Sequence, residues 1–128
     1  MKKILFIALV AVVCFTNCAK DDPEASPFPA TLETTAWRHT YDTNWGAPTD
    51  KGYITLTFSN GKMNTTHVIV DASGKMYMTP VSDGLVDYTY DSATGKGTVK
   101  RNNETLKLEI IKANTMLYDG KEYIRQNL

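Results

Sequence analysis

From residue 34 onward the chain consists of short runs in which apolar and polar side chains alternate. Ile54, Leu56 and Phe58 alternate with tyrosine and threonine, and residues 85–90 and 105–110 repeat the pattern. A period of two residues places alternate side chains on opposite faces of an extended strand. No window shows a sustained apolar period of about 3.6 residues, the helical repeat. The pattern therefore predicts an all-β fold without helices.

Residues that tolerate the positive φ of tight turns separate these runs. The expected turns are Asn60-Gly61, Ser73-Gly74, Asp83-Gly84, Thr94-Gly95, Asn102-Asn103 and Asp119-Gly120. They divide the chain into expected strands at 34–42, 52–59, 62–70, 75–81, 85–90, 97–101, 105–112, 115–118 and 121–126. Consecutive hairpins of this kind predict an antiparallel, up-and-down meander.

The expected strands are apolar on one side only, so a single open sheet would leave its apolar face in water. The sheet must therefore close into a barrel or fold into a sandwich. Eight or nine short sequential strands favour a small eight-stranded barrel, and a β-sandwich is the alternative.

Several short segments of the sequence together resemble a known family of small domains. They are Leu32-Glu33-Thr34-Thr35-Ala36-Trp37, Ile54-Thr55-Leu56-Thr57-Phe58 followed by Ser59-Asn60-Gly61, Leu106-Lys107-Leu108 and Tyr123-Ile124. The layout resembles the small lipocalin-like domains of bacterial lipoproteins and covers residues 32–128. The glycine usual before the tryptophan is absent, because Thr35-Ala36 stands there. The resemblance implies a barrel with a mouth that holds one small apolar ligand.

A filled barrel is the alternative, because an eight-stranded interior is only just wide enough for side chains. Trp37, Phe58, Tyr88 and Tyr90 are large enough to occupy it. Met76 and Met78, which flank Tyr77, are expected to fill the core as well.

The N-terminus reads as a bacterial lipoprotein signal. Lys2 and Lys3 precede twelve apolar residues, Ile4 to Phe15, a run too short to span a bilayer. Phe15-Thr16-Asn17-Cys18 then resembles a lipobox, which implies cleavage before Cys18 and acylation of that cysteine. We expect a signal peptide at 1–17, a lipid-anchored Pro-rich linker at 18–31 and a β domain at 32–128. The alternative is a soluble secreted protein in which Cys18 is incidental.

The residues after Cys18 indicate where in the cell envelope the protein is located. Lys20, Asp21 and Asp22 resemble the short signal that sends some lipoproteins to the outer face of the outer membrane; a plain solvated linker is the alternative. We therefore expect an outer-membrane protein, lipid-anchored at the cell surface or on the periplasmic face.

Charge argues against nucleic acid as a partner. Without Lys2 and Lys3 the chain has 12 basic and 14 acidic residues, a net charge of −2, and no basic cluster. The only cysteines are Cys14 and Cys18, so no disulfide framework is expected.

Motifs for chemistry are also missing from the sequence. His39 and His67 are the only histidines and lack metal-ligand spacing. No nucleophile elbow or phosphate loop occurs. We expect no metal, no cofactor and no enzymatic activity.

Trp45 stands in an expected loop, where it can contact a partner or fold back as a lid on the core. The leading hypothesis is a lipid-anchored binding module for a small apolar ligand, a glycan or an envelope protein. The competing hypothesis is an accessory lipoprotein with a filled barrel and no ligand.

Overall fold

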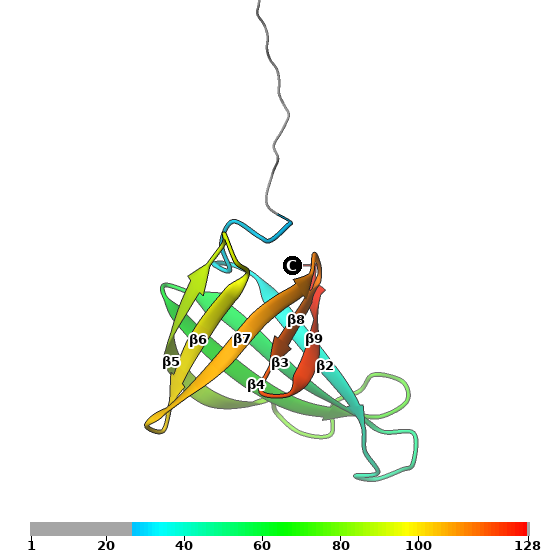
Figure 1. The fold of residues 1–128 in the computed structure, drawn as a ribbon. Coiled ribbons are helices and arrows are strands. Elements are labelled where there is room, and N and C mark those ends of the chain that lie inside the picture. Colours follow the sequence, from blue (N-terminus) through cyan, green and yellow to red (C-terminus); the bar gives the residue numbers. More distant parts are fainter. Residues whose placement is uncertain (1–26, 128) are drawn as a thin grey trace, which may run out of the picture.

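The computed structural model describes residues 27–127, which form eight antiparallel strands and no helix (Figure 1). The strands are β2 (Ala36–Asp42), β3 (Lys51–Ser59), β4 (Lys62–Val70), β5 (Val81–Asp91), β6 (Lys96–Arg101), β7 (Glu104–Lys112), β8 (Thr115–Tyr118) and β9 (Lys121–Gln126). Each pairs with the next along the chain, and β9 pairs with β2 to close the barrel. The predicted meander and barrel are confirmed.

Some predictions lie outside the described residues. They are the signal peptide at 1–17 and the proposed lipid and sorting residues Cys18, Lys20, Asp21 and Asp22. Within residues 27–127 no helix is long and apolar enough to cross a membrane.

The predicted strand at 75–81 is wrong. Residues 71–80 form a loop in which Met76 makes only an isolated bridge with Val70. Pro80 has no N–H to offer a sheet ladder. The strand that pairs with β4 begins at Val81 instead, opposite His67.

The predicted turn at Asp83-Gly84 is also wrong, because both residues lie inside β5. Asn64 pairs with Leu85 and Thr66 with Ser82, so two residues of β5 oppose Thr65 alone. This is a β-bulge, and Gly84 supplies its positive φ of 93°. Glycine tolerates positive φ both in this bulge and in the hairpin turns.

The predicted inward face is confirmed by burial. Leu56, Phe58, Leu108 and Ile110 are all buried, while the residues between them reach solvent. Trp37 is fully buried, and its indole N–H donates to Thr35 Oγ1 at 2.9 Å. The core cluster comprises Leu32, Trp37, Leu56, Phe58, Met63, Val99, Leu108, Ile110, Met116, Tyr118 and Tyr123.

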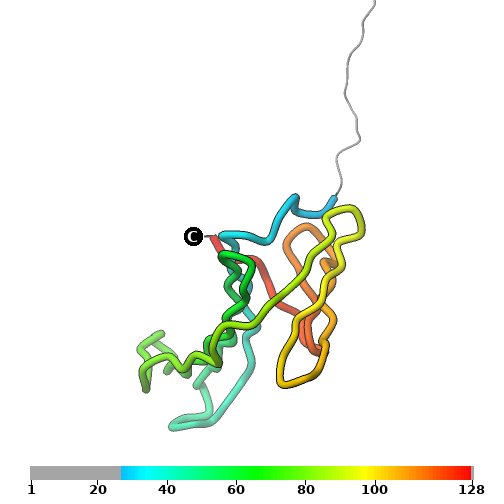
Figure 2. Tube along the Cα trace, turned by 90° about the vertical axis from the view of Figure 1, so that its left-hand side faces the viewer, coloured from blue at the N-terminus to red at the C-terminus, as the bar shows by residue number. Residues whose placement is uncertain are grey.

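The antiparallel order sorts the connections onto two ends of the barrel (Figures 1 and 2). Residues 27–35, the three turns at 60–61, 92–95 and 113–114, and the end of β9 lie at one end, which we name the N-terminal end. The loops 43–50 and 71–80 and the turns at 102–103 and 119–120 lie at the other, the distal end.

Residues 28–33 pack across the N-terminal end. Leu32 is fully buried, and Phe28 lies against Gly95, where an added Cβ would be 2.6 Å from the ring. The Tyr90 hydroxyl donates to the Pro29 carbonyl at 2.7 Å. The Glu33 carboxylate accepts hydrogen bonds from the Tyr88 hydroxyl and from the N–H groups of the 60–61 turn. The segment that leads into the barrel is thus fixed to it.

Candidate functional site at the distal end of the barrel

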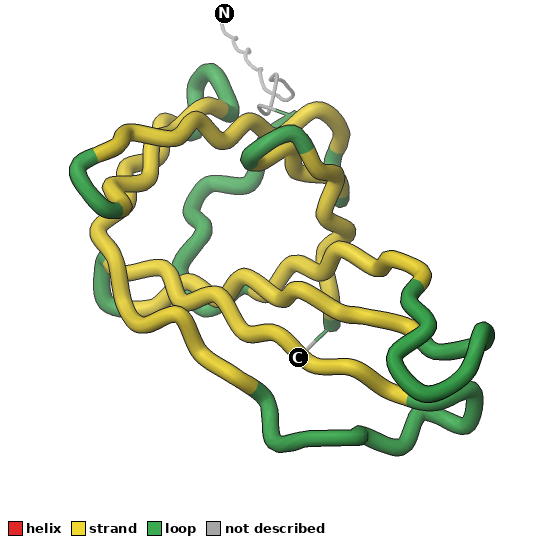
Figure 3. The backbone as a smooth tube through the Cα atoms, turned by 90° about the horizontal axis from the view of Figure 1, so that it is seen from below, coloured by secondary structure: helices red, strands yellow, loops and turns green. Residues whose placement is uncertain are grey.

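The two long distal loops lie side by side and are joined by Asp50 (Figure 3). Asp50 Oδ2 accepts the N–H groups of Gly46 and Ala47, each at 2.6 Å, and Oδ1 accepts the Tyr77 hydroxyl at 2.9 Å. Tyr77 N–H in turn donates to the Ile69 carbonyl at 2.9 Å, which fixes this part of loop 71–80 to β4. One carboxylate therefore organises both loops.

Asp50 is only 1% exposed, yet its hydrogen bonds favour the charged form. Burial opposes ionisation, but the N–H groups of Gly46 and Ala47 and the Tyr77 hydroxyl outweigh it and lower the pKa of Asp50. The same hydrogen bond, with burial, raises the pKa of Tyr77. Tyr77 therefore stays a donor and Asp50 an acceptor at neutral pH.

Large apolar side chains stand exposed on these loops. Trp45 is 61% exposed and Met76 is 54% exposed, and Tyr77 and Met78 are exposed as well. The predicted loop position of Trp45 is confirmed, and its exposure contradicts the alternative of a lid folded on the core. The expectation that Met76 and Met78 fill the core is wrong, because both side chains are exposed on loop 71–80 at the distal end.

Strands β2, β3 and β4 extend past the rest of the barrel at this end. Pairing of β2 with β9 stops at Arg38, and pairing of β4 with β5 stops at His67. The three strands stay paired with one another as far as Asp42, Lys51 and Val70. They form a three-stranded extension that carries both loops (Figure 1).

The inner face of this extension continues the core in register. Trp37, Leu56 and Thr65 form one buried row. The next row is His39, Ile54 and His67, and the last is Tyr41, Gly52 and Ile69, with Tyr77 beside Ile69. We name these last two rows, with Tyr77, the distal face.

Aromatic rings line the β2 side of the distal face. His39 stacks on Tyr41 at 6.1 Å between ring centroids and contacts the Tyr123 ring at 5.6 Å. The Tyr41 ring lies flat against Gly52, where any Cβ would overlap it. His39 Nδ1 is 3.0 Å from the Glu122 carbonyl oxygen, which fixes the imidazole across the point where β2 and β9 separate.

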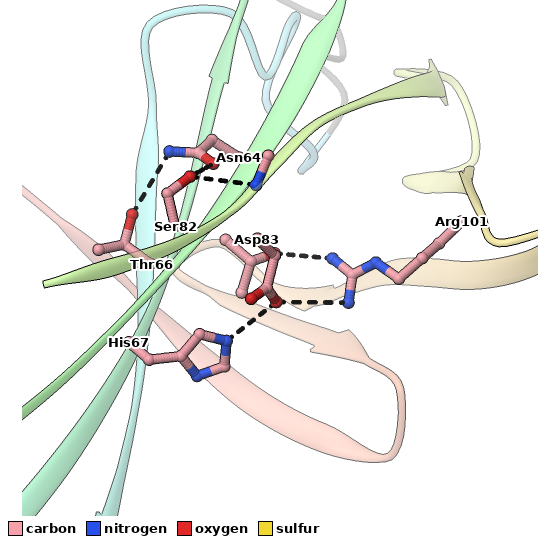
Figure 4. Close-up of polar contacts among 8 residues, drawn as sticks. Asn64, Thr66, His67, Ser82, Asp83 and Arg101 are labelled. Carbon is pink, nitrogen blue, oxygen red and sulfur yellow. Dashed lines mark hydrogen bonds and ion pairs between the residues drawn. The ribbon is translucent and has the colours of Figure 1, made fainter.

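Polar side chains from β4, β5 and β6 converge at the other side of the distal face (Figure 4). His67 Nε2 lies 2.9 Å from Asp83 Oδ2, and Arg101 Nη1 lies 3.9 Å from the same oxygen. Arg101 Nη2 donates to the buried Thr65 Oγ1 at 2.9 Å. We name His67, Asp83 and Arg101 the polar cluster; all three side chains are partly exposed.

The bulge in β5 brings Asp83 into the polar cluster. On the outer side of the same strands, Ser82 Oγ donates to Asn64 Oδ1 at 2.5 Å and accepts the Gly84 N–H at 3.1 Å (Figure 4). These bonds hold the bulge and engage the Ser82 hydroxyl away from His67. Ser82 is therefore not placed as a nucleophile beside the His67 imidazole.

Tyr118 adds a further polar group at this end. Its hydroxyl is buried and finds no hydrogen-bond partner among the described residues. Burial raises the pKa of Tyr118, while nearby Arg101 lowers it and Asp83 raises it. Burial likewise raises the pKa of the neighbouring Tyr123 to about 12.

The sequence predicts the loop position of Trp45 but does not predict the polar cluster. His67 shares the parity of Met63 on β4, which indicates an inward side chain, but Asp83 was assigned to a turn. Among the described residues no group of three or more His, Cys, Asp or Glu side chains is placed to hold a metal ion. One hollow on the outer wall, lined by Thr89, Lys96 and Lys107, lies away from this end, and another is lined by Arg101 and the distal turn at 102–103.

Comparison of the chain with protein-family models, with curated proteins and with solved structures finds no significant match.

Proposed function

We propose that the chain is a lipid-anchored protein of the bacterial envelope whose barrel presents a binding surface at its distal end. The observation that carries the proposal is the opposite placement of two features. Residues 28–33 are fixed across the N-terminal end, and the exposed Trp45 and Met76 stand at the distal end (Figure 1). A tether through Cys18 would leave the distal end free to meet a ligand.

Packing of the interior favours a ligand on the surface over one inside the barrel. Trp37, Phe58, Met63, Leu108 and Met116 are each at most 1% exposed and pack in one cluster. An apolar ligand in the barrel would have to displace them, and a close-packed core resists added volume.

The anchor is tested by comparing the native chain with Cys18→Ala in a Gram-negative host. We expect the native protein to carry acyl chains by mass spectrometry, to fractionate with the outer membrane and to be cut by protease added to intact cells. Protection from that protease would favour the periplasmic face. A native protein that is soluble and unacylated would contradict the proposal, together with the assignment of Lys20, Asp21 and Asp22 as a sorting signal.

The binding surface is tested by photo-crosslinking in intact cells. A photoreactive residue at Trp45 is expected to give adducts, and the same residue at the exposed wall position Lys107 is the matched control. Adducts from 107 and none from 45 would instead support an accessory lipoprotein that acts through its wall. That second function is also consistent with the filled core.

A further inference from the structure

The distal face combines two chemical features that a single ligand must match. The exposed rings of Tyr41 and Tyr77 lie in its last row, and the exposed Trp45 stands on the loop that Asp50 joins to Tyr77; we name these three rings the aromatic side. The polar side is the polar cluster of His67, Asp83 and Arg101, which also reaches solvent. The register places Tyr41 and His67 in adjacent rows of one sheet.

The aromatic side is held in place before any ligand arrives. Tyr77 is fixed by its hydrogen bond to Asp50, and the Trp45 loop by the two N–H groups that Asp50 accepts. Tyr41 is seated on Gly52 and stacked on His39. Fixed rings lose little entropy on binding, and flat rings suit a ligand with flat, weakly polar C–H faces.

The polar side offers spare donors and acceptors with balanced charge. The Arg101 guanidinium has five N–H groups, and Asp83 has two acceptor oxygens. Within residues 27–127, the Arg101 guanidinium donates a hydrogen bond to Thr65 and pairs with Asp83. Because the cation and the carboxylate offset one another, the cluster favours neutral hydroxyl groups over a net anion or cation.

We propose that the distal face binds a neutral carbohydrate chain. The sugar rings stack on Tyr41, Tyr77 and Trp45, and their hydroxyl groups bond to Asp83, Arg101 and His67. This inference rests on the proposed function and assigns the ligand class of its binding surface. Tyr, Trp and Arg side chains also dominate protein interfaces, so a protein partner is the competing outcome of the test.

Titration of the detergent-solubilised full chain tests the proposal. The probes are neutral hexasaccharides of α-1,4- and β-1,4-linked glucose, β-1,4-linked xylose and β-1,4-linked mannose, with hexagalacturonate as the anionic comparison. Trp37 is fully buried and Trp45 is exposed, so a change in tryptophan emission on binding reports Trp45. We expect at least one neutral probe to bind, with a Kd that changes less than about twofold between low and high salt.

Four variants separate the loss of ring stacking from a general loss of structure. Trp45→Ala and Tyr41→Ala are each expected to weaken binding about tenfold or more, measured by calorimetry. Gly52→Ala retains every aromatic ring, but the added Cβ displaces the Tyr41 ring, so a similar loss of affinity is expected. Leu117→Ala removes an exposed apolar side chain from the wall and is expected to bind normally. Circular dichroism checks that each variant is folded.

The outcomes distinguish this inference from the proposed function. If no neutral hexasaccharide binds while crosslinks from position 45 capture a protein, the carbohydrate assignment is overturned and the binding surface stands. If hexagalacturonate binds and the neutral probes do not, the ligand is anionic and the assignment is overturned. If no hexasaccharide binds and the photoreactive residue at position 45 gives no crosslinks, both proposals fail.

Discussion

At the residue scale, Asp50 is the side chain on which the distal end depends most. It stands just before β3 and is buried, and its acceptors are engaged by both long loops. Nothing in the alternation of the sequence marks it, because its role arises from the meeting of segments 27 residues apart. Loss of its charge should therefore loosen two loops at once.

We expect Asp50→Asn to loosen loops 43–50 and 71–80 without unfolding the barrel. The amide oxygen can accept the N–H groups of Gly46 and Ala47, but the NH₂ then faces the Tyr77 hydroxyl, which must change from donor to acceptor. Loss of the charge also weakens all of these hydrogen bonds. Faster hydrogen exchange at Gly46, Ala47 and Tyr77 would show this. Asp42→Asn is the matched control, since Asp42 is exposed and only pairs with Lys51. Equal exchange in both variants would contradict the role of Asp50.

The pH dependence of the loops follows from the same carboxylate. The pKa of Asp50 is lowered in the folded protein, so its contribution is complete above the unfolded value of about 3.9 and is lost as pH falls through the folded value. The Asp50→Asn variant should show loosened loops at every pH. Trp45 emission, followed from neutral to acidic pH, checks the difference.

At the element scale, the bulge of β5 is a feature that the sequence pattern alone does not predict. The periods of two residues in β3, β5 and β7 were enough to predict the strands, the inward face and the closed barrel. Asp83-Gly84 has the composition of a hairpin turn, and only the pairing of the flanking residues, Ser82 with Thr66 and Leu85 with Asn64, shows a bulge. Local propensity could not decide between them, because both need positive φ at glycine. The polar cluster was missed for this reason.

Gly84→Ala is expected to destabilise the barrel by about 1–2 kcal/mol, the cost of a left-handed backbone for an L-residue. Nothing lies within 4 Å of the added Cβ, so the cost is conformational and not steric. Urea denaturation measures it. Gly74→Ala, with a φ of 90° and equally open surroundings, is the matched loop control.

The two variants should differ in their effect on the polar cluster. A shift of the bulge moves Asp83, so the imidazole resonances of His67 should change in Gly84→Ala and not in Gly74→Ala. Unchanged His67 resonances would show that the bulge does not position Asp83.

At the scale of the whole molecule, the N-terminal segment would determine how the barrel is oriented if the chain is anchored as we propose. Glu33 joins this segment to the 60–61 turn and to Tyr88 on β5, and Leu32 inserts into the core. We name these contacts of Glu33 and Leu32 the joint. A tethered chain can present its distal end only if the joint is firm. The joint was not predictable from sequence, because Glu33 is polar and precedes the first strand.

We expect the joint to open in acid. The Tyr88 hydroxyl lowers the pKa of Glu33 most; burial opposes this, and the N–H groups of Gly61 and Asn60 lower it further. A lowered folded pKa means that Glu33 stabilises the joint above its unfolded value of about 4.3 and that this stabilisation is lost as pH falls through the folded value. Hydrogen exchange at Asn60 and Gly61 should therefore accelerate in acid in the native chain.

Glu33→Gln separates this carboxylate from general acid unfolding. The neutral amide should give rapid exchange at Asn60 and Gly61 already at neutral pH, with little further change on acidification. Exchange at the wall strands β6 and β7, whose ladder does not involve Glu33, should be alike in both proteins. If acid accelerates hydrogen exchange at Asn60 and Gly61 equally in Glu33→Gln and in the native chain, another group controls the joint. The orientation of a tethered barrel then cannot depend on Glu33.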